Sequence, residues 1–219
     1  MRKNQFYESK ITVLVVLSTM LLTFATISPA EAYGQGQYQS GNVIYIDESS
    51  PFHNNSKYLN PYKYRRMNMS NAPFAPVPLA NLNNLKLLHW NLTDVQLKQC
   101  YDIALNISRP CANFSLKDKL KYIAANVRAF HNRYVTYSTE APHFLDAYGF
   151  YVLNSASCQG AACAVGLCLN LLGIEYEHVN HNKWTHQWCR VKVGNTYWIC
   201  DAYGVYCGPE PAPYKHPYF

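Results

Sequence analysis

Residues 158–173 read CQGAACAVGLCLNLLG, a nearly continuous apolar run that ends at a glycine. Its length and its lack of charge predict a buried helix at the centre of the fold. Gly173 is the residue type that often follows a helix C-terminus, and Ser155 and Ser157 offer N-cap oxygens. Cys158 would then open the helix, where the partial positive charge of the N-terminus favours a thiolate.

A β-hairpin is predicted behind this helix. The turn signal Gly194-Asn195 favours a two-residue connection between strands that span residues 186–202. The register set by this turn makes His186 and Asp201 diagonal neighbours on one face of the ladder. A histidine beside a carboxylate is what a general base and its orienting acid require. Cys158, His186 and Asp201 therefore form a candidate catalytic triad.

Helices come before strands along the rest of the chain. Thr93 to Gln96 forms a capping-box pattern that predicts a helix to about Asn106. Ser115 should open a second helix, and further elements are a short helix near 144–153 and a strand at about 174–180. The apolar face of the second helix is expected to consist of Leu116, Leu120, Ile123, Ala124, Val127 and Phe130. The Pro-rich tail 207–217 predicts irregular coil, and the fold class is α+β.

The chain divides into three parts. Residues 1–32 combine a basic start, an apolar stretch and the cleavage signal Ala30-Glu31-Ala32, which predicts a signal peptide cut after Ala32. A transmembrane anchor is the alternative for this stretch. Residues 33–78 are rich in Tyr, Asn and Pro and predict an extended arm, and residues 79–219 predict one catalytic domain. The mature protein is expected to be secreted or at the cell surface, with no membrane contact after cleavage.

Charge and side-chain spacing exclude several classes of ligand. The formal net charge of +6 is modest and dispersed, so it suits an anionic cell wall or surface better than nucleic acid. His178, His181, His186 and Cys189 lie close in sequence, but without a paired CxxC motif they do not predict a zinc site. No acidic loop of the calcium-binding type is present. We expect no metal and no cofactor.

Export would permit disulfides among the eight cysteines. Cys100 and Cys111 bracket a short loop, and the hairpin register places Cys189 opposite Cys200 on the face away from His186. A Cys200–Cys207 bridge is the alternative. The remaining two thiols are expected to be small buried core residues of the apolar helix: Cys163 and Cys168.

Three sequence blocks resemble the transglutaminase-like branch of the papain-like cysteine enzymes. The family's nucleophile block, Cys-x-Gly followed by an aromatic and Ala, corresponds to Cys158–Ala162, with Ala161 in place of the aromatic. Its His-x-Trp block corresponds to His186-Gln187-Trp188. Its acid ends a strand with an aromatic pair, here Tyr197-Trp198-Ile199-Cys200-Asp201. The resemblance covers roughly Leu116 to Gly204.

This resemblance implies a papain-like core in which N-terminal helices and a central nucleophile helix pack on a small antiparallel sheet. It also implies attack of Cys158 on a protein or peptide amide through an acyl-thioester intermediate, by glutamine acyl transfer or deamidation. The backbone N–H of Cys158 is an expected oxyanion donor. The family often adds a side-chain donor, and the candidates for this donor and for the substrate cleft are Gln159, Trp184, Trp188 and Tyr148.

Two alternatives remain open at this point. The chain would act as a cysteine peptidase or amidase on cell-wall or protein substrates if water, rather than an amine, accepts the acyl group. It would be an inactive transglutaminase-like binding module if the triad does not assemble, with the Tyr-rich arm as the interacting part. The oligomeric state has no signature in the sequence.

Overall fold

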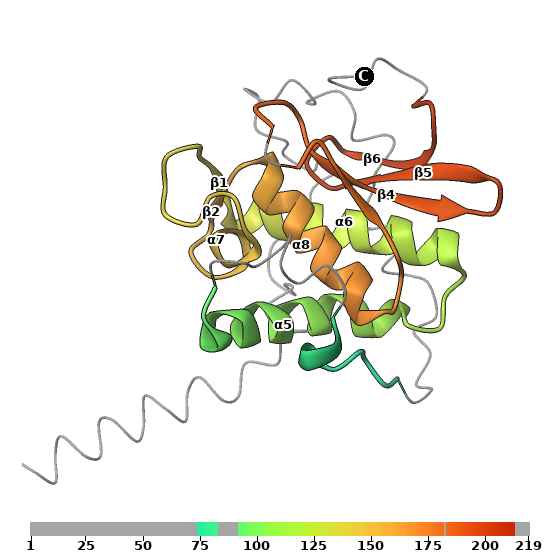
Figure 1. Ribbon diagram of the computed structural model, residues 1–219, viewed down its shortest axis with the longest axis horizontal. Coiled ribbons are helices and arrows are strands. Elements are labelled where there is room, and N and C mark those ends of the chain that lie inside the picture. Colours follow the sequence, from blue (N-terminus) through green and yellow to red (C-terminus); the bar gives the residue numbers. More distant parts are fainter. Residues whose placement is uncertain (1–73, 83–91, 182, 213–219) are drawn as a thin grey trace, which may run out of the picture. The chain divides into compact units, whose positions relative to one another are not determined.

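A computed structural model describes residues 74–82, 92–181 and 183–212 of the 219-residue chain. The predicted signal peptide and residues 33–73 of the predicted arm lie outside these ranges. Helical elements come first along the described chain and an antiparallel sheet follows, so the predicted α+β class is confirmed (Figure 1). The elements in order are η2 (Leu79–Asn81), α5 (Asp94–Ser108), η3 (Arg109–Cys111), α6 (Leu116–Tyr134), β1 (Thr136–Tyr137), α7 (Ala147–Tyr151), β2 (Ser155–Ala156), α8 (Cys158–Leu171), β3 (Glu177–Val179), β4 (Trp188–Val193), β5 (Thr196–Asp201) and β6 (Tyr206–Pro209).

Helices α5 and α6 begin at the N-cap residues that the sequence predicts, Thr93 and Ser115. Thr93 and Gln96 form a reciprocal capping box, in which each side chain bonds the backbone N–H of the other. The Ser115 side chain accepts from the backbone N–H of Asp118. The predicted apolar face of α6 is buried except at its first position, because Leu116 is 36% exposed at the helix start.

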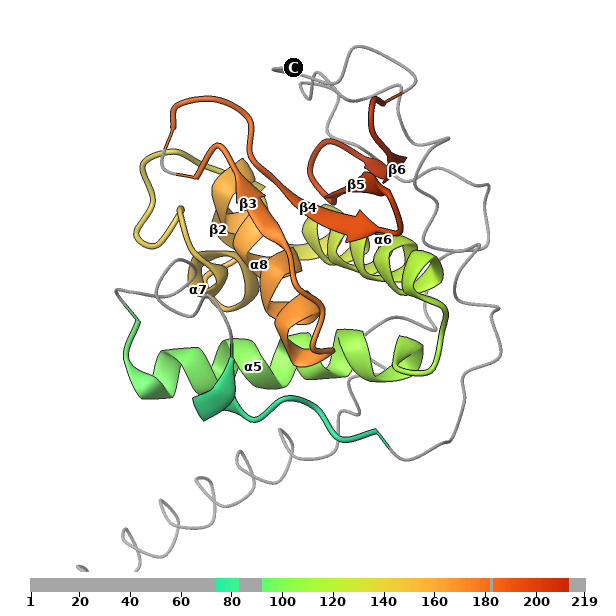
Figure 2. The same cartoon turned by 45° about the vertical axis from the view of Figure 1, so that its right-hand side comes forward.

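The apolar helix α8 begins at Cys158 and ends as predicted. Gly173 adopts a φ of 67°, and its N–H donates to the carbonyl of Asn170 while that of Ile174 donates to Leu169. These two bonds make a Schellman motif, which a residue with a Cβ would strain. In Figures 1 and 2, α8 crosses in front of α6 and its C-terminal end reaches α5; α8 contacts both of these helices as well as α7 and β4. Its central position explains why nearly every side chain of α8 is buried.

The four-stranded sheet has the order β3-β4-β5-β6, with all neighbours antiparallel. The predicted hairpin register is confirmed, since Val193 pairs with Thr196 and Cys189 pairs with Cys200. The prediction of irregular coil after residue 207 is wrong at its start, because β6 pairs with β5 over Tyr206–Pro209. This strand forms through its partner, since its own short sequence has no strand signal.

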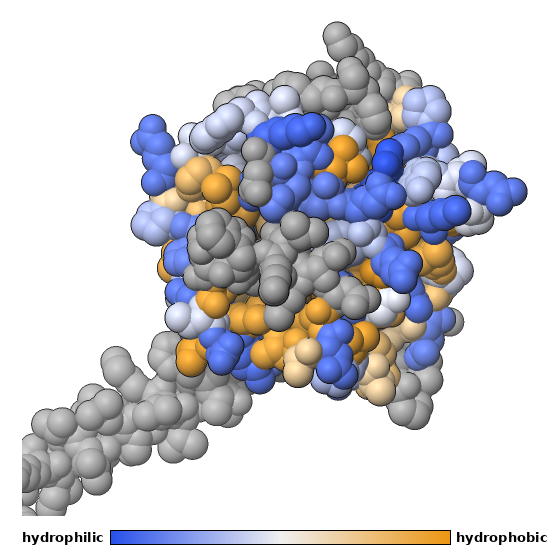
Figure 3. All heavy atoms as spheres, in the orientation of Figure 1, coloured by the Kyte–Doolittle hydropathy of each residue, from blue (hydrophilic) through white to orange (hydrophobic). Residues whose placement is uncertain are grey.

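One face of the sheet packs on helices. The Cys189 thiol donates to the Ala162 carbonyl of α8 at 3.2 Å, and the Cys200 thiol donates to the Leu120 carbonyl of α6 at 3.5 Å. The opposite face carries a buried cluster of Trp188, Ile199 and Tyr206. In Figure 3, hydrophilic side chains prevail over the upper part of the molecule, where Figure 1 draws these strands.

All eight cysteines lie within the described residues, and all are free thiols. Neither the Cys100–Cys111 bridge nor either predicted bridge of Cys200 is formed in the structure. Cys189 and Cys200 are opposed in the ladder, but their thiols turn to carbonyls of two different helices. Register alone therefore did not determine the direction of the sulfur atoms.

Among the described residues, no helix is both long and apolar enough to cross a lipid bilayer.

Candidate active site

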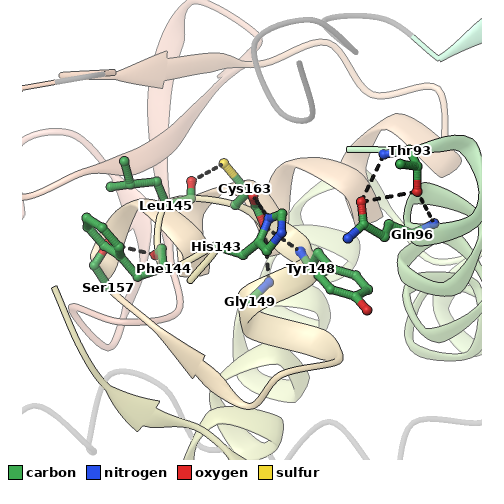
Figure 4. A network of polar contacts seen from close by, with 10 residues as sticks. Thr93, Gln96, His143, Phe144, Leu145, Tyr148, Gly149, Ser157 and Cys163 are labelled. Atoms are coloured by element: carbon green, nitrogen blue, oxygen red, sulfur yellow. Dashed lines mark hydrogen bonds and ion pairs between the residues drawn. The ribbon is translucent and has the colours of Figure 1, made fainter. Parts of the chain in front are cut away.

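Cys158 is the first residue of α8, and the loop of residues 143–146 presses against this helix start. The predicted serine cap is only half confirmed, because Ser157 is the N-cap residue but its hydroxyl donates to the Phe144 carbonyl at 3.1 Å (Figure 4). A Cβ on Gly160 would lie 2.8 Å from both that carbonyl oxygen and the Ala156 Cβ. Gly160 therefore lets the loop approach closely, and Cys158 is held at a fixed point.

His186 lies two residues before β4, in the loop that follows β3. The Asn180 side chain donates to the His186 carbonyl at 3.1 Å, which fixes the backbone of this loop. The imidazole stacks on Trp188, with 5.7 Å between ring centroids and 22° between planes. His186 is 3% exposed, so its ring orientation is set by packing as well as by hydrogen bonds.

Asp201 ends β5 and is 2% exposed. Its Oδ2 is 2.5 Å from His186 Nε2, and its Oδ1 accepts the backbone N–H of Gly204 at 2.7 Å. Both carboxylate oxygens thus have a partner, as a buried charge requires. Arg128 of α6 donates from Nη1 to the Tyr203 carbonyl at 3.2 Å and so holds the turn that contains this acid.

Cys158 lies near enough to the His186 ring to help Asp201 raise the pKa of the imidazole. Since Nε2 faces the carboxylate, Nδ1 is the nitrogen available to the thiol. The thiol also lies 4.0 Å from the Thr185 carbonyl. The structure therefore brings the three predicted residues together in the order Cys158, His186, Asp201.

The contacts of His186 determine whether its ring is charged. Burial alone lowers the pKa of His186, but the charge and hydrogen bond of Asp201, with a smaller effect of Cys158, raise it to about 9. His186 is therefore an imidazolium at neutral pH. The pKa of His186 in the unfolded chain is near 6.5, so the His186–Asp201 ion pair contributes its full stabilisation below pH 6.5. This stabilisation is lost as the pH rises to about 9.

Exposure separates Cys158 from the other thiols. It is partly exposed, whereas the seven other cysteines are buried. Burial raises the pKa of Cys100 and Cys111 to about 12 and that of Cys168 to about 11. These buried thiols are poor nucleophiles near neutral pH, because the thiolate is the reactive form.

The candidates for the oxyanion donor and cleft have different surroundings. Gln159 is buried, and its Oε1 accepts from Gln187 Nε2 at 2.9 Å. Trp188 lies under the imidazole ring and thereby supports His186. Trp184 is 89% exposed, and the ring of Tyr148 packs edge-on against His143. Only Gln159 and Trp188 are therefore packed beside the triad.

Sequence reasoning missed Gly204, Gln187 and Arg128. Gly204 supplies a main-chain donor to Asp201, and a glycine three residues after a candidate acid is the only local signal for it. Gln187 stands inside the His-x-Trp block but was treated as the variable position. Arg128 is 1% exposed in α6, and nothing near it in the sequence marks its contact with Tyr203.

No group of three His, Cys, Asp or Glu side chains that could hold a metal ion occurs among the described residues. The rings of His178 and His181 do contact each other, with centroids 4.7 Å apart. His178 bonds Gln187 through Nε2, however, so this nitrogen is engaged by an amide.

The substitution Gly204→Ala is expected to break the hydrogen bond between His186 and Asp201. A Cβ at this position would collide with the Asp201 carboxylate and lie 3.1 Å from His186 Nε2. We expect about 1–3 kcal/mol of destabilisation, as for other overpacked sites, and much slower alkylation of Cys158. Thermal unfolding and iodoacetamide labelling at pH 7 measure the two effects. Gly194→Ala is the control, since it strains a turn with φ of 63° and no atoms within 4 Å; equal labelling rates in both variants would contradict the prediction.

No protein-family model matches the sequence, and no curated protein matches it.

Proposed function

We propose that this chain is an exported cysteine enzyme of the transglutaminase-like type, with a papain-like core, acting on protein or peptide amides. The observation that carries the proposal is the buried His186–Asp201 hydrogen bond near a partly exposed Cys158 at a helix start. Such a constellation activates a thiol for attack on a carbonyl. Along the sequence, the helix that carries Cys158 follows other helices and precedes an antiparallel sheet, and it contacts both the helices and the sheet. This order of elements supports the same family.

The chemistry proceeds in two steps with His186 as the proton carrier. The Cys158 sulfur, its proton held by His186, attacks the amide carbon and forms an S–C bond. The C–N bond then breaks, and the leaving amine takes the proton from His186. A second amine or water gives a proton back to His186 as it attacks the thioester, which releases the acyl product and the thiol. Asp201 keeps its charge throughout and holds the ring by Nε2.

Glutamine side chains of proteins or peptides are the proposed acyl donors, with an amine or water as acceptor. The test incubates the purified protein with a glutamine peptide and an amine probe, and mass spectrometry identifies the products. An amide-linked probe with released ammonia indicates transfer, glutamate indicates deamidation, and a new amino terminus indicates a peptidase. Absence of all three products from the wild-type chain would refute the proposed activity.

A thiol probe separates an enzyme from an inactive binding module. Iodoacetamide near neutral pH is expected to label Cys158 first, because the other seven thiols are buried. Uniformly slow labelling of all eight would favour the module.

Export is proposed from the first 32 residues, with a secreted or cell-surface location. The sequence Ala30-Glu31-Ala32 places the cut after Ala32. N-terminal sequencing of the protein from its native source should therefore begin at Tyr33. A chain that still begins at Met1 would instead indicate a retained segment.

A further inference from the structure

Three cysteines lie in one row across the sheet, and the proposed acyl transfer uses none of them. Cys189 of β4 pairs with Cys200 of β5, and Cys200 pairs with Cys207 of β6. Directly opposed residues of a ladder project from the same face, so all three thiols belong to the face that packs on the helices. Cys200 therefore has two neighbours in register, and the hydrogen bonds of the two ladders distinguish them.

The β4–β5 hairpin makes Cys189 and Cys200 a hydrogen-bonded pair. Residues 194–195 form a two-residue turn, so the closing pair Val193–Thr196 exchanges its backbone hydrogen bonds. Hydrogen-bonded and non-hydrogen-bonded pairs alternate along an antiparallel ladder. The pair four residues further along, Cys189–Cys200, is therefore hydrogen-bonded again, and the backbone N–H and C=O of Cys200 point toward β4.

The β5–β6 ladder has the opposite phase at Cys200. The backbone N–H of Glu210 donates to the Tyr197 carbonyl at 2.9 Å, which marks a hydrogen-bonded pair at the end of this ladder. Alternation from this pair makes Cys200 and Cys207 a non-hydrogen-bonded pair. Pro209, which has no backbone N–H, also falls at a non-hydrogen-bonded position, as this phase requires.

This phase favours Cys207 over Cys189 as a disulfide partner of Cys200. Opposed side chains lie closer at a non-hydrogen-bonded pair, and a disulfide needs Cβ atoms about 3.5–4.5 Å apart. The Cys189 thiol moreover donates to the Ala162 carbonyl of α8, whereas the Cys200 thiol donates to the Leu120 carbonyl of α6. The proximity of Cys207 is the largest cause that raises the pKa of the Cys200 thiol, ahead of burial.

The Cys200–Cys207 pair encloses the turn that holds the acid of the triad. Asp201 directly follows Cys200 and accepts the backbone N–H of Gly204 inside this turn. Val205 has a φ of 58°, a costly conformation for a β-branched residue, which the surrounding structure must maintain. A covalent bond across the base of the turn would limit its opening and thereby keep Gly204 against the carboxylate.

We propose that Cys200 and Cys207 form a redox site, at which a low-molecular-weight disulfide oxidises the two thiols to a bond that locks the turn around Asp201. The Cys207 thiol, 6% exposed on the edge strand β6, loses its proton to solvent and attacks one sulfur of the oxidant, whose other sulfur leaves as a thiolate and takes up a proton. Cys200 loses its proton and attacks the mixed disulfide at Cys207, which releases the second thiol. The protein gives up two electrons and two protons, and the oxidant is reduced to two thiols.

The redox site does not depend on the proposed acyl transfer. The proposed export would bring the pair into surroundings in which disulfides persist. The free thiols of the structure are the reduced state of this site.

Peptide mapping tests which pair is oxidised. Purified full-length protein is incubated with excess glutathione disulfide at mildly alkaline pH, unfolded in iodoacetamide and cut with trypsin without reduction. Cys200 and Cys207 lie in one tryptic peptide, 193–215, which should be two hydrogens lighter and carry no alkyl group. Cys189 lies in another peptide, 184–190, so a Cys189–Cys200 bond would join the two. Joined peptides, glutathione adducts of 193–215 or two alkylated thiols in it would overturn the proposal.

Cys207→Ala and Cys189→Ala are the matched variants, since each removes one buried neighbour of Cys200. Cys189→Ala should still form the bond within peptide 193–215, whereas Cys207→Ala should keep Cys200 as an alkylated thiol. A Cys189–Cys200 bond in Cys207→Ala, or no bond in Cys189→Ala, would overturn the choice made by the ladder phase. Thermal unfolding identifies a variant that fails to fold, and serine then replaces alanine at that position.

The lock on the turn is measured in a Cys158→Ala chain, in which the nucleophile cannot take up glutathione. Oxidation should raise the midpoint of thermal unfolding by about 5 °C or more, because the closed loop restricts the unfolded chain. It should also slow hydrogen exchange at the Gly204 N–H, and both effects should be absent when Cys207→Ala is added. A bond that forms without slowing this exchange would overturn the lock. No amide turnover enters these measurements, so an inactive wild type would refute the proposed function alone.

Discussion

Cys158→Ala is expected to lower amide turnover by about three orders of magnitude or more, with the fold intact. The variant lacks the sulfur atom proposed to form the acyl thioester, and binding and oxyanion contacts alone leave little residual rate. The thiol is partly exposed and lies 4.0 Å from the Thr185 carbonyl, so its loss removes little packing. Initial rates on a glutamine peptide, with thermal unfolding alongside, measure both expectations.

Cys163→Ala is the matched control for this variant. Cys163 lies in the same helix, is 1% exposed, and donates to the Leu145 carbonyl at 3.5 Å (Figure 4). Its loss should cost some stability while turnover by the folded fraction stays within about threefold of wild type, because Cys163 only packs. Equal loss of turnover in the two variants, or full turnover in Cys158→Ala, would contradict the assignment of the nucleophile.

The sequence predicted the features whose signals are local. The Thr93–Gln96 box and Gly173 act within one helical turn, so they place the helix ends correctly. The Gly194-Asn195 turn determines the pairing behind it, because one residue of slippage would reverse both faces of the hairpin. The proximity of His186 and Asp201 follows from this register and needed no knowledge of the tertiary structure.

Features that depend on distant partners could not be predicted in this way. β6 is a strand because β5 offers a free edge, and its residues Tyr206–Pro209 lack any alternation of their own. The hydrogen bonds from His178 to Gln187 and from Gln187 to Gln159 join three different segments of the chain. The direction of the Cys189 and Cys200 thiols depends on which helix carbonyls lie beneath the sheet. In each case the deciding contact is made by residues outside the segment itself.

Asp201→Asn is the second variant with a large expected effect, and its main action is on the tautomer of His186. The backbone N–H of Gly204 needs an acceptor, so the amide oxygen of the new side chain must face Gly204. The amide nitrogen then faces His186 Nε2, which can only accept from it. The ring proton must therefore move to Nδ1, the nitrogen left available to Cys158, and His186 can no longer take the thiol proton.

We expect turnover in Asp201→Asn to fall by about 10²–10⁴-fold, the scale seen when a triad carboxylate becomes an amide. The charge of Asp201 is also lost, so only the smaller effect of Cys158 still opposes burial, and the pKa of His186 falls from its wild-type value of about 9. In wild type, the free energy of unfolding should decrease from pH 6.5 to about 9, whereas this decrease should vanish in the variant. Denaturant unfolding across this range and histidine proton titration measure both effects.

Asp146→Asn provides the control for this variant. His143 Nδ1 lies 2.8 Å from Asp146 Oδ2, so the chain holds a second histidine–carboxylate pair at a half-buried loop. Asparagine also caps helices well, so the bonds of Asp146 to the N–H groups of Tyr148 and Gly149 should largely survive. Turnover in this variant should stay within about threefold of wild type. If Asp146→Asn and Asp201→Asn reduced turnover equally, the effect would belong to general destabilisation, and Asp201 would have no special link to the protonation of His186.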